Sequence, residues 1–288
     1  DTKIKLFEAV AREKRGIGIY NLDDEAAKYF LEPPVALKYG YAWKQKELPR
    51  GMRFVKAEDV KIGPSGTSFA ANGRAYETPL IGEFNFYNAL TAVTAAAALD
   101  LSPEVVSQTL KNPPRIPGRF EIIQEKPFLV IVDYAHEPKS LEEVYKAVKL
   151  KKPKRILGIL GSQGGGRDLW KRKAMGEVAA RYLDRLVLTN EDPYDENSVD
   201  IINDVEAGTK NSERKVSVEK IVDRKQAIRR VIELAKPGDA VILTGKGGEV
   251  WMCVEGGKKI PWDEAGIVRE ILLMQNTRSK VKGLRNTK

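Results

Sequence analysis

The second half of the chain alternates short apolar runs with amphipathic segments. Four apolar runs predict buried strands, at 128–132, 155–160, 185–188 and 240–243. Helical periodicity predicts five helices, at 140–149, 169–182, 199–207, 224–235 and 263–274. Strands that are apolar throughout and alternate with helices are typical of a parallel sheet covered on both faces. We therefore predict a doubly wound α/β domain whose ligands bind beyond the carboxyl ends of the strands.

The first part of the chain mixes shorter elements. Helices are predicted at 3–14 and 86–99, a strand at 16–20, and a β-hairpin or meander across 51–80. The prolines at 113–114 end the preceding helix and predict a linker, so we place one domain at 1–113 and a second at 114–288. The chain does not begin with Met and opens inside a predicted helix, so we expect a fragment of a longer protein.

Composition narrows the class of protein. With 42% hydrophobic and 8% aromatic residues, 288 residues can bury a substantial core. No apolar run is long enough to cross a bilayer and no signal peptide is evident, so we expect no membrane partner. A single cysteine, Cys253, and a single histidine, His136, exclude an internal disulfide and a His-rich zinc site. This cysteine usage favours a cytoplasmic protein.

The chain is basic, with a formal net charge of +9. The basic residues are spread along the sequence, with local runs at 149–155 and 278–288, and no aromatic-and-basic nucleic-acid motif accompanies them. A solvated surface with a loose basic tail from about residue 276 explains this pattern better than nucleic-acid binding. A polyphosphate or carboxylate substrate would also suit the charge.

Polar or glycine-rich loops follow all four predicted strands. In the first, at 133–138, His136 could orient a phosphate, although a lone histidine in a loop more often caps it. In the second, at 161–168, four glycines let backbone N–H groups approach an anion, and Arg167 adds a fork for carboxylate or phosphate. The alternative is a flexible turn. The cations at 171–172 oppose the dipole of the next helix, which a bound anion would explain.

The other two loops carry acidic residues. Carboxylates in 189–196 could meet an amino group, or they could cap the next helix. The glycine-rich loop 244–249 ends in one acid and suits a zwitterion, or it is a tight turn between strand and helix. Taken alone, each loop is better explained as a turn or a helix cap than as a binding site. Together, on one rim of one sheet, the four loops predict a binding site.

Ordered motifs along nearly the whole chain resemble the Mur ligases. They are Gly-Glu-Phe-Asn-Phe-Tyr-Asn-Ala at 82–89, Pro-Gly-Arg-Phe-Glu at 117–121 and Asp-Tyr-Ala-His at 133–136. The later loops, at 164–168, 191–193 and 245–249, look like the MurE branch, the UDP-N-acetylmuramyl-tripeptide synthetases. The resemblance implies the last part of a central ATPase domain followed by a Rossmann-like C-terminal domain. No Gly-Lys-Ser/Thr of a P-loop occurs here, so we expect the chain alone to be inactive.

The resemblance also implies an activity. Such ligases use ATP and Mg²⁺ to convert the carboxylate of a UDP-N-acetylmuramoyl-dipeptide into an acyl phosphate, which the amine of a diamino acid then displaces. It implies a cytoplasmic enzyme of peptidoglycan synthesis, which we expect to be monomeric. Two alternatives stay open: a ligase of the folylpolyglutamate synthetase type, and a non-catalytic binding or scaffold module.

Site residues follow from the same resemblance. By spacing, Lys3 matches a catalytic lysine whose carbamylated form supplies oxygen to Mg²⁺. The residues that match nucleotide contacts are Asn85, Asn88, Arg119, Asp133 and His136. His136 also matches a catalytic residue. The residues that match the binding site of the incoming amino acid are Arg167, Asp192, Tyr194, Gly245 and Glu249.

Three departures from the family pattern concern this second group. Diaminopimelate-adding enzymes carry Asp-Asn-Pro-Arg where this chain has Glu-Asp-Pro-Tyr at 191–194, so the arginine fork for a distal carboxylate is lost. The acidic residues there favour a distal ammonium, hence lysine or another diamino acid. Gly248 replaces a family histidine and Gly166 a family aspartate.

Overall fold

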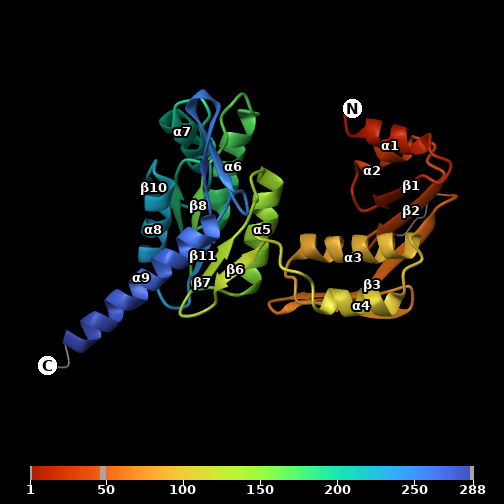
Figure 1. Cartoon of the computed structure of the whole chain (residues 1–288), viewed down its shortest axis with the longest axis horizontal. Helices are drawn as coiled ribbons and strands as arrows, with labels where there is room; N and C mark the ends of the chain where they lie inside the picture. Colours follow the sequence, from red (N-terminus) through yellow and green to blue (C-terminus); the bar gives the residue numbers. More distant parts are fainter. Residues whose placement is uncertain (1, 46–49, 286–288) are drawn as a thin grey trace. The chain divides into compact units, whose positions relative to one another are not determined.

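The computed structural model describes residues 2–45 and 50–285, without the side chains of 276 and 278–285. The chain divides into two compact units, Asp1–Pro114 and Arg115–Lys288, each with its own sheet (Figure 1). The division falls directly after the second of two consecutive prolines, which cannot continue a helix.

The C-terminal unit is built on a six-stranded sheet in the order β10-β9-β8-β11-β7-β6. Its strands are β6 (Glu121–Gln124), β7 (Leu129–Val132), β8 (Ile156–Leu160), β9 (Arg185–Leu188), β10 (Ser217–Lys220) and β11 (Ala240–Leu243). All neighbours pair in parallel except β6, an antiparallel edge strand. The doubly wound α/β prediction is confirmed. The edge strands β6 and β10 were not predicted, because they are short and only partly apolar.

Helices cover both faces of this sheet (Figure 1). They are α5 (Pro138–Leu150), α6 (Trp170–Tyr182), α7 (Ser198–Thr209), α8 (Arg224–Leu234) and α9 (Glu264–Arg285). Apolar side chains of α8 and α9 pack against alternate residues of β7, β8, β9 and β11 and form the core on one face. All five predicted helices are present. The helix α9 continues past Met274, where we expected it to end and a loose tail to begin, and 286–288 lie outside the described residues.

A two-stranded hairpin, absent from the sequence prediction, follows β11. It consists of β12 (Trp251–Val254), a turn at η1 (Glu255–Gly257) and β13 (Lys258–Pro261). Gly256 and Gly257 both adopt positive φ, 70° and 69°, which is the backbone that a tight hairpin turn requires. Cys253 pairs directly with Lys259, so these two side chains lie on the same face of the hairpin.

The N-terminal unit has a five-stranded sheet in the order β1-β2-β3-β4-β5. The strands are β1 (Ile17–Asn21), β2 (Leu37–Ala42), β3 (Arg53–Gly63), β4 (Gly66–Ala71) and β5 (Arg74–Thr78), and the last three form the predicted antiparallel meander. The helices are α1 (Ile4–Ala11), α2 (Ala27–Leu31), α3 (Glu83–Ala98) and α4 (Pro103–Lys111). The helix α3 begins three residues before the predicted start, and β2, α2 and α4 were not predicted. No helix in the described part of the chain is long and apolar enough to span a membrane.

Helices α6 and α7 approach each other at two glycines. A Cβ atom built on Gly176 would lie 1.9 Å from the carbonyl oxygen of Val205, and one on Gly208 would lie 1.9 Å from that of Lys173. No side chain fits at either position unless the helices separate. Because α6 follows β8 and α7 follows β9, this contact fixes the spacing of the loops that precede both helices.

We predict that Gly176→Ala and Gly208→Ala each destabilise the protein by about 1–3 kcal/mol, since overpacking outweighs a helix-propensity gain of about 1 kcal/mol. Urea unfolding measures the change. Lys173→Ala is the matched control, because it removes only an exposed side chain and keeps the backbone carbonyl that contacts Gly208, and it should shift stability by no more than about 0.5 kcal/mol. A Gly176→Ala variant as stable as the control would contradict the close contact.

Candidate functional site

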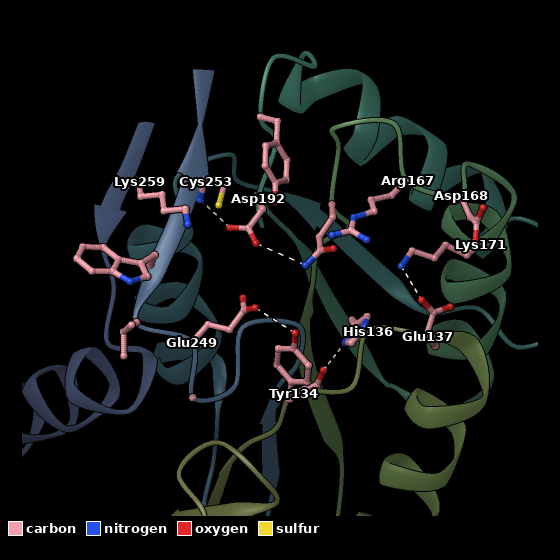
Figure 2. Close-up of a pocket in the computed structure, with 15 residues that line it drawn as sticks. Tyr134, His136, Glu137, Arg167, Asp168, Lys171, Asp192, Glu249, Cys253 and Lys259 are labelled. Atoms are coloured by element: carbon pink, nitrogen blue, oxygen red, sulfur yellow. Dashed lines mark hydrogen bonds and ion pairs between the residues drawn. The ribbon is translucent and has the colours of Figure 1, made fainter. Parts of the chain in front are cut away.

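The loops after four adjacent strands meet at one edge of the C-terminal sheet. These strands are β9, β8, β11 and β7 in spatial order, and they are mutually parallel, so their carboxyl ends lie together. A pocket of about 610 Å³ opens there (Figure 2). Its walls are formed by Tyr134, His136, Glu137, Gln163, Arg167, Asp168, Lys171, Asp192, Tyr194, Gly248, Glu249, Val250, Trp251, Cys253 and Lys259. Four loops predicted from the sequence and the unpredicted hairpin contribute to it.

A buried lysine joins two of the loops. The Nζ of Lys246, whose side chain is 0% exposed, lies 2.8 Å from Oδ1 of Asp192 and 2.6 Å from Oε2 of Glu249. Burial disfavours the ammonium, but the hydrogen bonds to both carboxylates outweigh it and raise the pKa of Lys246. The Tyr134 hydroxyl donates to the other oxygen of Glu249 at 3.0 Å. Two acids that the sequence assigned to the amino group of a substrate are therefore already partly neutralised by the protein.

Asp192 also fixes the hairpin to the end of β9. Its Oδ1 accepts the backbone N–H of Cys253 at 2.9 Å. The backbone N–H of Tyr194 donates to the carbonyl of Cys253 at 3.3 Å, and that of Gly256 donates to Oδ1 of Asp195 at 2.8 Å. The hairpin is thus attached along its length and forms a defined wall of the pocket.

Protein carboxylates account for the two cations at the start of α6. Lys171 Nζ lies 2.7 Å from Oε1 of Glu137, and the buried Arg172 is paired with Glu196 at 2.7 Å and Asp204 at 3.1 Å. The expectation that a bound anion explains these residues is wrong for Arg172, which does not line the pocket. Arg167 differs, because it lies in the pocket wall and forms no ion pair with a described residue.

His136 lines the pocket, and its surroundings define which ring nitrogen carries the proton. Its Nδ1 lies 2.8 Å from the carbonyl oxygen of Tyr134, which can only accept, so Nδ1 carries the proton. The Nε2 atom therefore remains for a ligand.

Asp133, by contrast, uses both carboxylate oxygens to accept hydrogen bonds from the backbone N–H groups of Phe120 and Ala135, each at 2.7 Å. Burial raises the pKa of Asp133. The exposed Arg119 lies over the ring of Tyr134, 4.4 Å from its centre.

Gly245 lies behind the pocket rather than in its wall. A Cβ atom there would meet Oε2 of Glu191 at 2.1 Å, so glycine at the end of β11 makes room for that carboxyl. Glu191 is 1% exposed, and neither of its oxygens has a hydrogen-bond partner among the described residues. It does not line the pocket. Of the two adjacent acids thought to attract a distal ammonium, only Asp192 is in place to do so.

The two units match two domains of one known family. Residues 1–96 match the Mur ligase middle domain, and residues 118–247 match the glutamate ligase domain of Mur ligases. The chain belongs to the Mur ligase family. The UDP-N-acetylmuramoyl-L-alanyl-D-glutamate--2,6-diaminopimelate ligase of Syntrophomonas wolfei is 34% identical over 285 residues, which cover 97% of this chain and 55% of the relative. The ligase of the same name from Solibacter usitatus is 40% identical over 280 residues, 94% of this chain and 54% of the relative.

The chain therefore spans about half the length of the curated Mur ligases it matches. Among solved structures, a UDP-N-acetylmuramoyl-L-alanyl-D-glutamate--2,6-diaminopimelate ligase is similar with a TM-score of 0.56 and 27% identity, over 95% of this chain and 56% of that one. A folylpolyglutamate synthase of Mycobacterium tuberculosis has a TM-score of 0.64 at 16% identity, over 84% of this chain and 56% of its own. At that identity the likeness shows a shared fold.

The structure shows which atoms surround Gly248 and Gly166, two of the residues that depart from the Mur ligase pattern. A Cβ atom on Gly248 would lie 2.5 Å from the carbonyl oxygen of Pro117, so a histidine fits here only if the segment at 117–118 moves. Gly166 has a φ of 73°, which disfavours an aspartate, and a Cβ atom there would meet nothing within 4 Å. Glycine at 248 therefore allows a close backbone contact. Glycine at 166 allows a left-handed turn where no other atom is near.

Two of the predicted site residues of the N-terminal unit, Asn85 and Asn88, contact each other, because the Asn88 amide donates to Oδ1 of Asn85 at 3.4 Å. Lys3 immediately precedes α1 and lines a pocket of about 530 Å³ with Thr2, Ile4, Ala26, Tyr29 and Phe30. Asn85 is buried and donates to the carbonyl of Ile81 at 2.9 Å, whereas Asn88 is exposed on α3. No carboxylate lines the pocket beside Lys3, and the described residues contain no cluster of three or more His, Cys, Asp or Glu side chains. The groups present do not by themselves form a Mg²⁺ site.

Four residues of the pocket lie outside every loop that the sequence predicted as part of the site. They are at the base of the hairpin or on it: Val250, Trp251, Cys253 and Lys259. The glycine pair at 256–257, flanked by residues of high strand propensity, was the available signal for a hairpin.

Glu191 generates a prediction about pH. Burial raises its pKa to about 7, only partly offset by the positive charges of Arg224 and Lys246. A carboxyl with a raised folded-state pKa stabilises the fold at acidic pH and loses that contribution as pH rises through the folded pKa. We expect the wild-type protein to lose up to about 3 kcal/mol from this group between pH 5 and 8.

Glu191→Gln should lack this loss, so its stability relative to wild type should improve as pH increases. Urea unfolding at pH 5 and pH 8 measures the difference. Equal pH dependence in the two proteins would mean that Glu191 is ionised and solvated in the folded state.

Proposed function

We propose that the full-length protein is an ATP-dependent ligase of the MurE type, which adds a diamino acid as the third residue of a UDP-N-acetylmuramoyl-dipeptide. The observation that carries the proposal is the presence of Arg167, Asp192 and Glu249 in one pocket at the strand ends. The names of its relatives, as ligases for 2,6-diaminopimelate, support the same reaction class.

The pocket suits a zwitterion. Arg167 forms no ion pair with a described residue, although it has a side-chain hydrogen bond with Tyr194, so its guanidinium can bind a carboxylate as a planar fork. Asp168 forms no ion pair with a described residue, and Glu249 exposes part of its carboxylate (32% of the side chain), so both can accept from an ammonium. An amino acid held this way presents its amine beside His136, whose Nε2 can accept a proton as the amine becomes a nucleophile.

The proposed reaction has two steps. The dipeptide carboxylate attacks the γ-phosphorus of ATP and releases ADP, which leaves an acyl phosphate. The amine of the diamino acid then attacks the acyl carbon and displaces inorganic phosphate, so that an amide bond forms. Both steps depend mainly on alignment and charge neutralisation.

The cofactors of this proposal are ATP and Mg²⁺. On the present chain, Asn88, Arg119 and His136 are accessible for nucleotide contact, whereas Asn85 and Asp133 are engaged with backbone groups and would act by shaping their loops. The described residues around Lys3 offer no carboxylate set that would hold Mg²⁺. We further propose a monomer that acts in the cytoplasm, where ATP is available.

Amino-acid-dependent phosphate release by the full-length protein tests the proposal. With UDP-N-acetylmuramoyl-dipeptide and ATP present, a diamino acid should stimulate release. Arg167→Ala should raise the KM for the amino acid roughly 10- to 100-fold, the equivalent of one charged hydrogen-bonded contact, and leave the KM for ATP unchanged.

The matched control is Lys173→Ala, an exposed cation of α6 outside the pocket, which should behave as wild type. Absence of stimulation by lysine, ornithine and diaminopimelate alike would refute the proposed ligase activity.

A further inference from the structure

Lys259 is a pocket cation for which the family pattern gives no role. It projects from β13 into the pocket on the face that it shares with Cys253 (Figure 2). Its ammonium forms neither an ion pair nor a hydrogen bond with a described residue, whereas its backbone pairs with β12. Its backbone is held in place through Cys253, its direct cross-strand partner. The backbone of Cys253 hydrogen-bonds to the Asp192 carboxylate and to the backbone N–H of Tyr194.

Two cations that form no ion pair with a described residue consequently face the same pocket from different elements, although Arg167 has a side-chain hydrogen bond with Tyr194. Figure 2 shows Arg167 and Lys259 on opposite sides of Asp192. The other two lysines at this site, Lys171 and Lys246, are committed to protein carboxylates. A ligand with a single carboxylate leaves Arg167 or Lys259 without a carboxylate partner, whereas a ligand with two carboxylates can meet both.

The pocket also retains acidic groups for two ammonium ions. Lys246 carries one positive charge and contacts two carboxylates, so the group of Lys246, Asp192 and Glu249 keeps a net negative charge. Asp168 supplies a second negative charge in the wall. Two cations and two net anionic positions match an acid with two carboxylates and two amines.

We propose that Lys259 is a specificity-determining residue, which binds the distal carboxylate of a diamino dicarboxylic acid. It takes over the task of the arginine that the 191–194 loop lacks. This inference rests on the proposed function and deepens it, since it selects a diaminopimelate-like acid over lysine. The preference for lysine drawn from the acidic loop loses part of its basis, because Glu191 is buried behind Gly245 and does not reach the pocket.

The position of Tyr194 explains why a hairpin residue is needed. Tyr194 adopts a φ of 51°, and its ring lies against Gly165, where a Cβ atom would meet it at 2.8 Å. This side chain fills its part of the wall with an aromatic ring and a hydroxyl. A cation for the distal carboxylate must come from another element, and the hairpin is the neighbouring one.

The test is phosphate release by the full-length protein with meso-diaminopimelate or lysine as the amino acid. Wild type should have a lower KM for diaminopimelate. Lys259→Met should raise the KM for diaminopimelate about tenfold and change that for lysine less than about twofold, because only the former has a distal carboxylate. Lys259→Arg should keep the wild-type preference.

Lys258→Met is the matched control, since Lys258 is the preceding hairpin residue and its side chain points to the other face. It should retain the KM of wild type for both amino acids. A wild-type preference for lysine, or equal effects of Lys259→Met on both KM values, would overturn the role of Lys259 while the ligase proposal stands. No stimulation by either amino acid would refute both.

Discussion

The buried ammonium of Lys246 is the constraint on which the site depends. It comes from the loop after β11 and lies between Asp192, after β9, and Glu249, three residues further along its own loop. Removing one partner of a buried charge group leaves an uncompensated charge, which costs about 3–5 kcal/mol. The ion group therefore holds two strand-end loops in a single arrangement, although β9 and β11 are separated in the sheet by β8.

A second buried ion pair fixes the ends of the same two strands. Arg224, at the start of α8, is bidentate to Glu264 and donates to the carbonyls of Asn190 at 3.1 Å and Thr244 at 2.7 Å. Asn190 lies two residues after the end of β9 and Thr244 directly follows β11, where the loops of Asp192 and Lys246 begin. The ends of β9 and β11 and the loops that follow them are thus joined by two buried cations, Arg224 and Lys246. The hairpin depends on the same arrangement, because Asp192 accepts its backbone N–H from Cys253.

Much of this architecture could be predicted from the sequence. Four apolar runs gave the central strands, and because parallel strands end at one edge, their loops had to converge there. The convergence of Arg167, Asp192 and Glu249 follows from that topology. The edge strands β6 and β10 escaped prediction because each is four residues long and only partly apolar. The hairpin carried a glycine-pair signal that was overlooked.

The direction of side chains within the loops could not be predicted. Glu191 and Asp192 are adjacent in the sequence, yet one is buried behind the pocket and the other lines it. Spacing alone also gives no reason to pair Lys246 with Asp192, which is 54 residues away. Such pairing depends on which strands become neighbours. The catalytic and nucleotide-binding roles of Lys3, Asn85, Asn88, Arg119 and Asp133 stay predictions of the family resemblance.

A double-mutant cycle on Lys246 and Asp192 tests most directly whether their ion pair holds the site together. The free energies of unfolding of Lys246→Met, Asp192→Asn and the double variant would be measured in urea against wild type. We predict a coupling energy of at least about 1 kcal/mol, with the double variant less destabilised than the sum of the single variants. Additivity to within about 0.5 kcal/mol would contradict the account, because it would mean that the two loops are positioned independently.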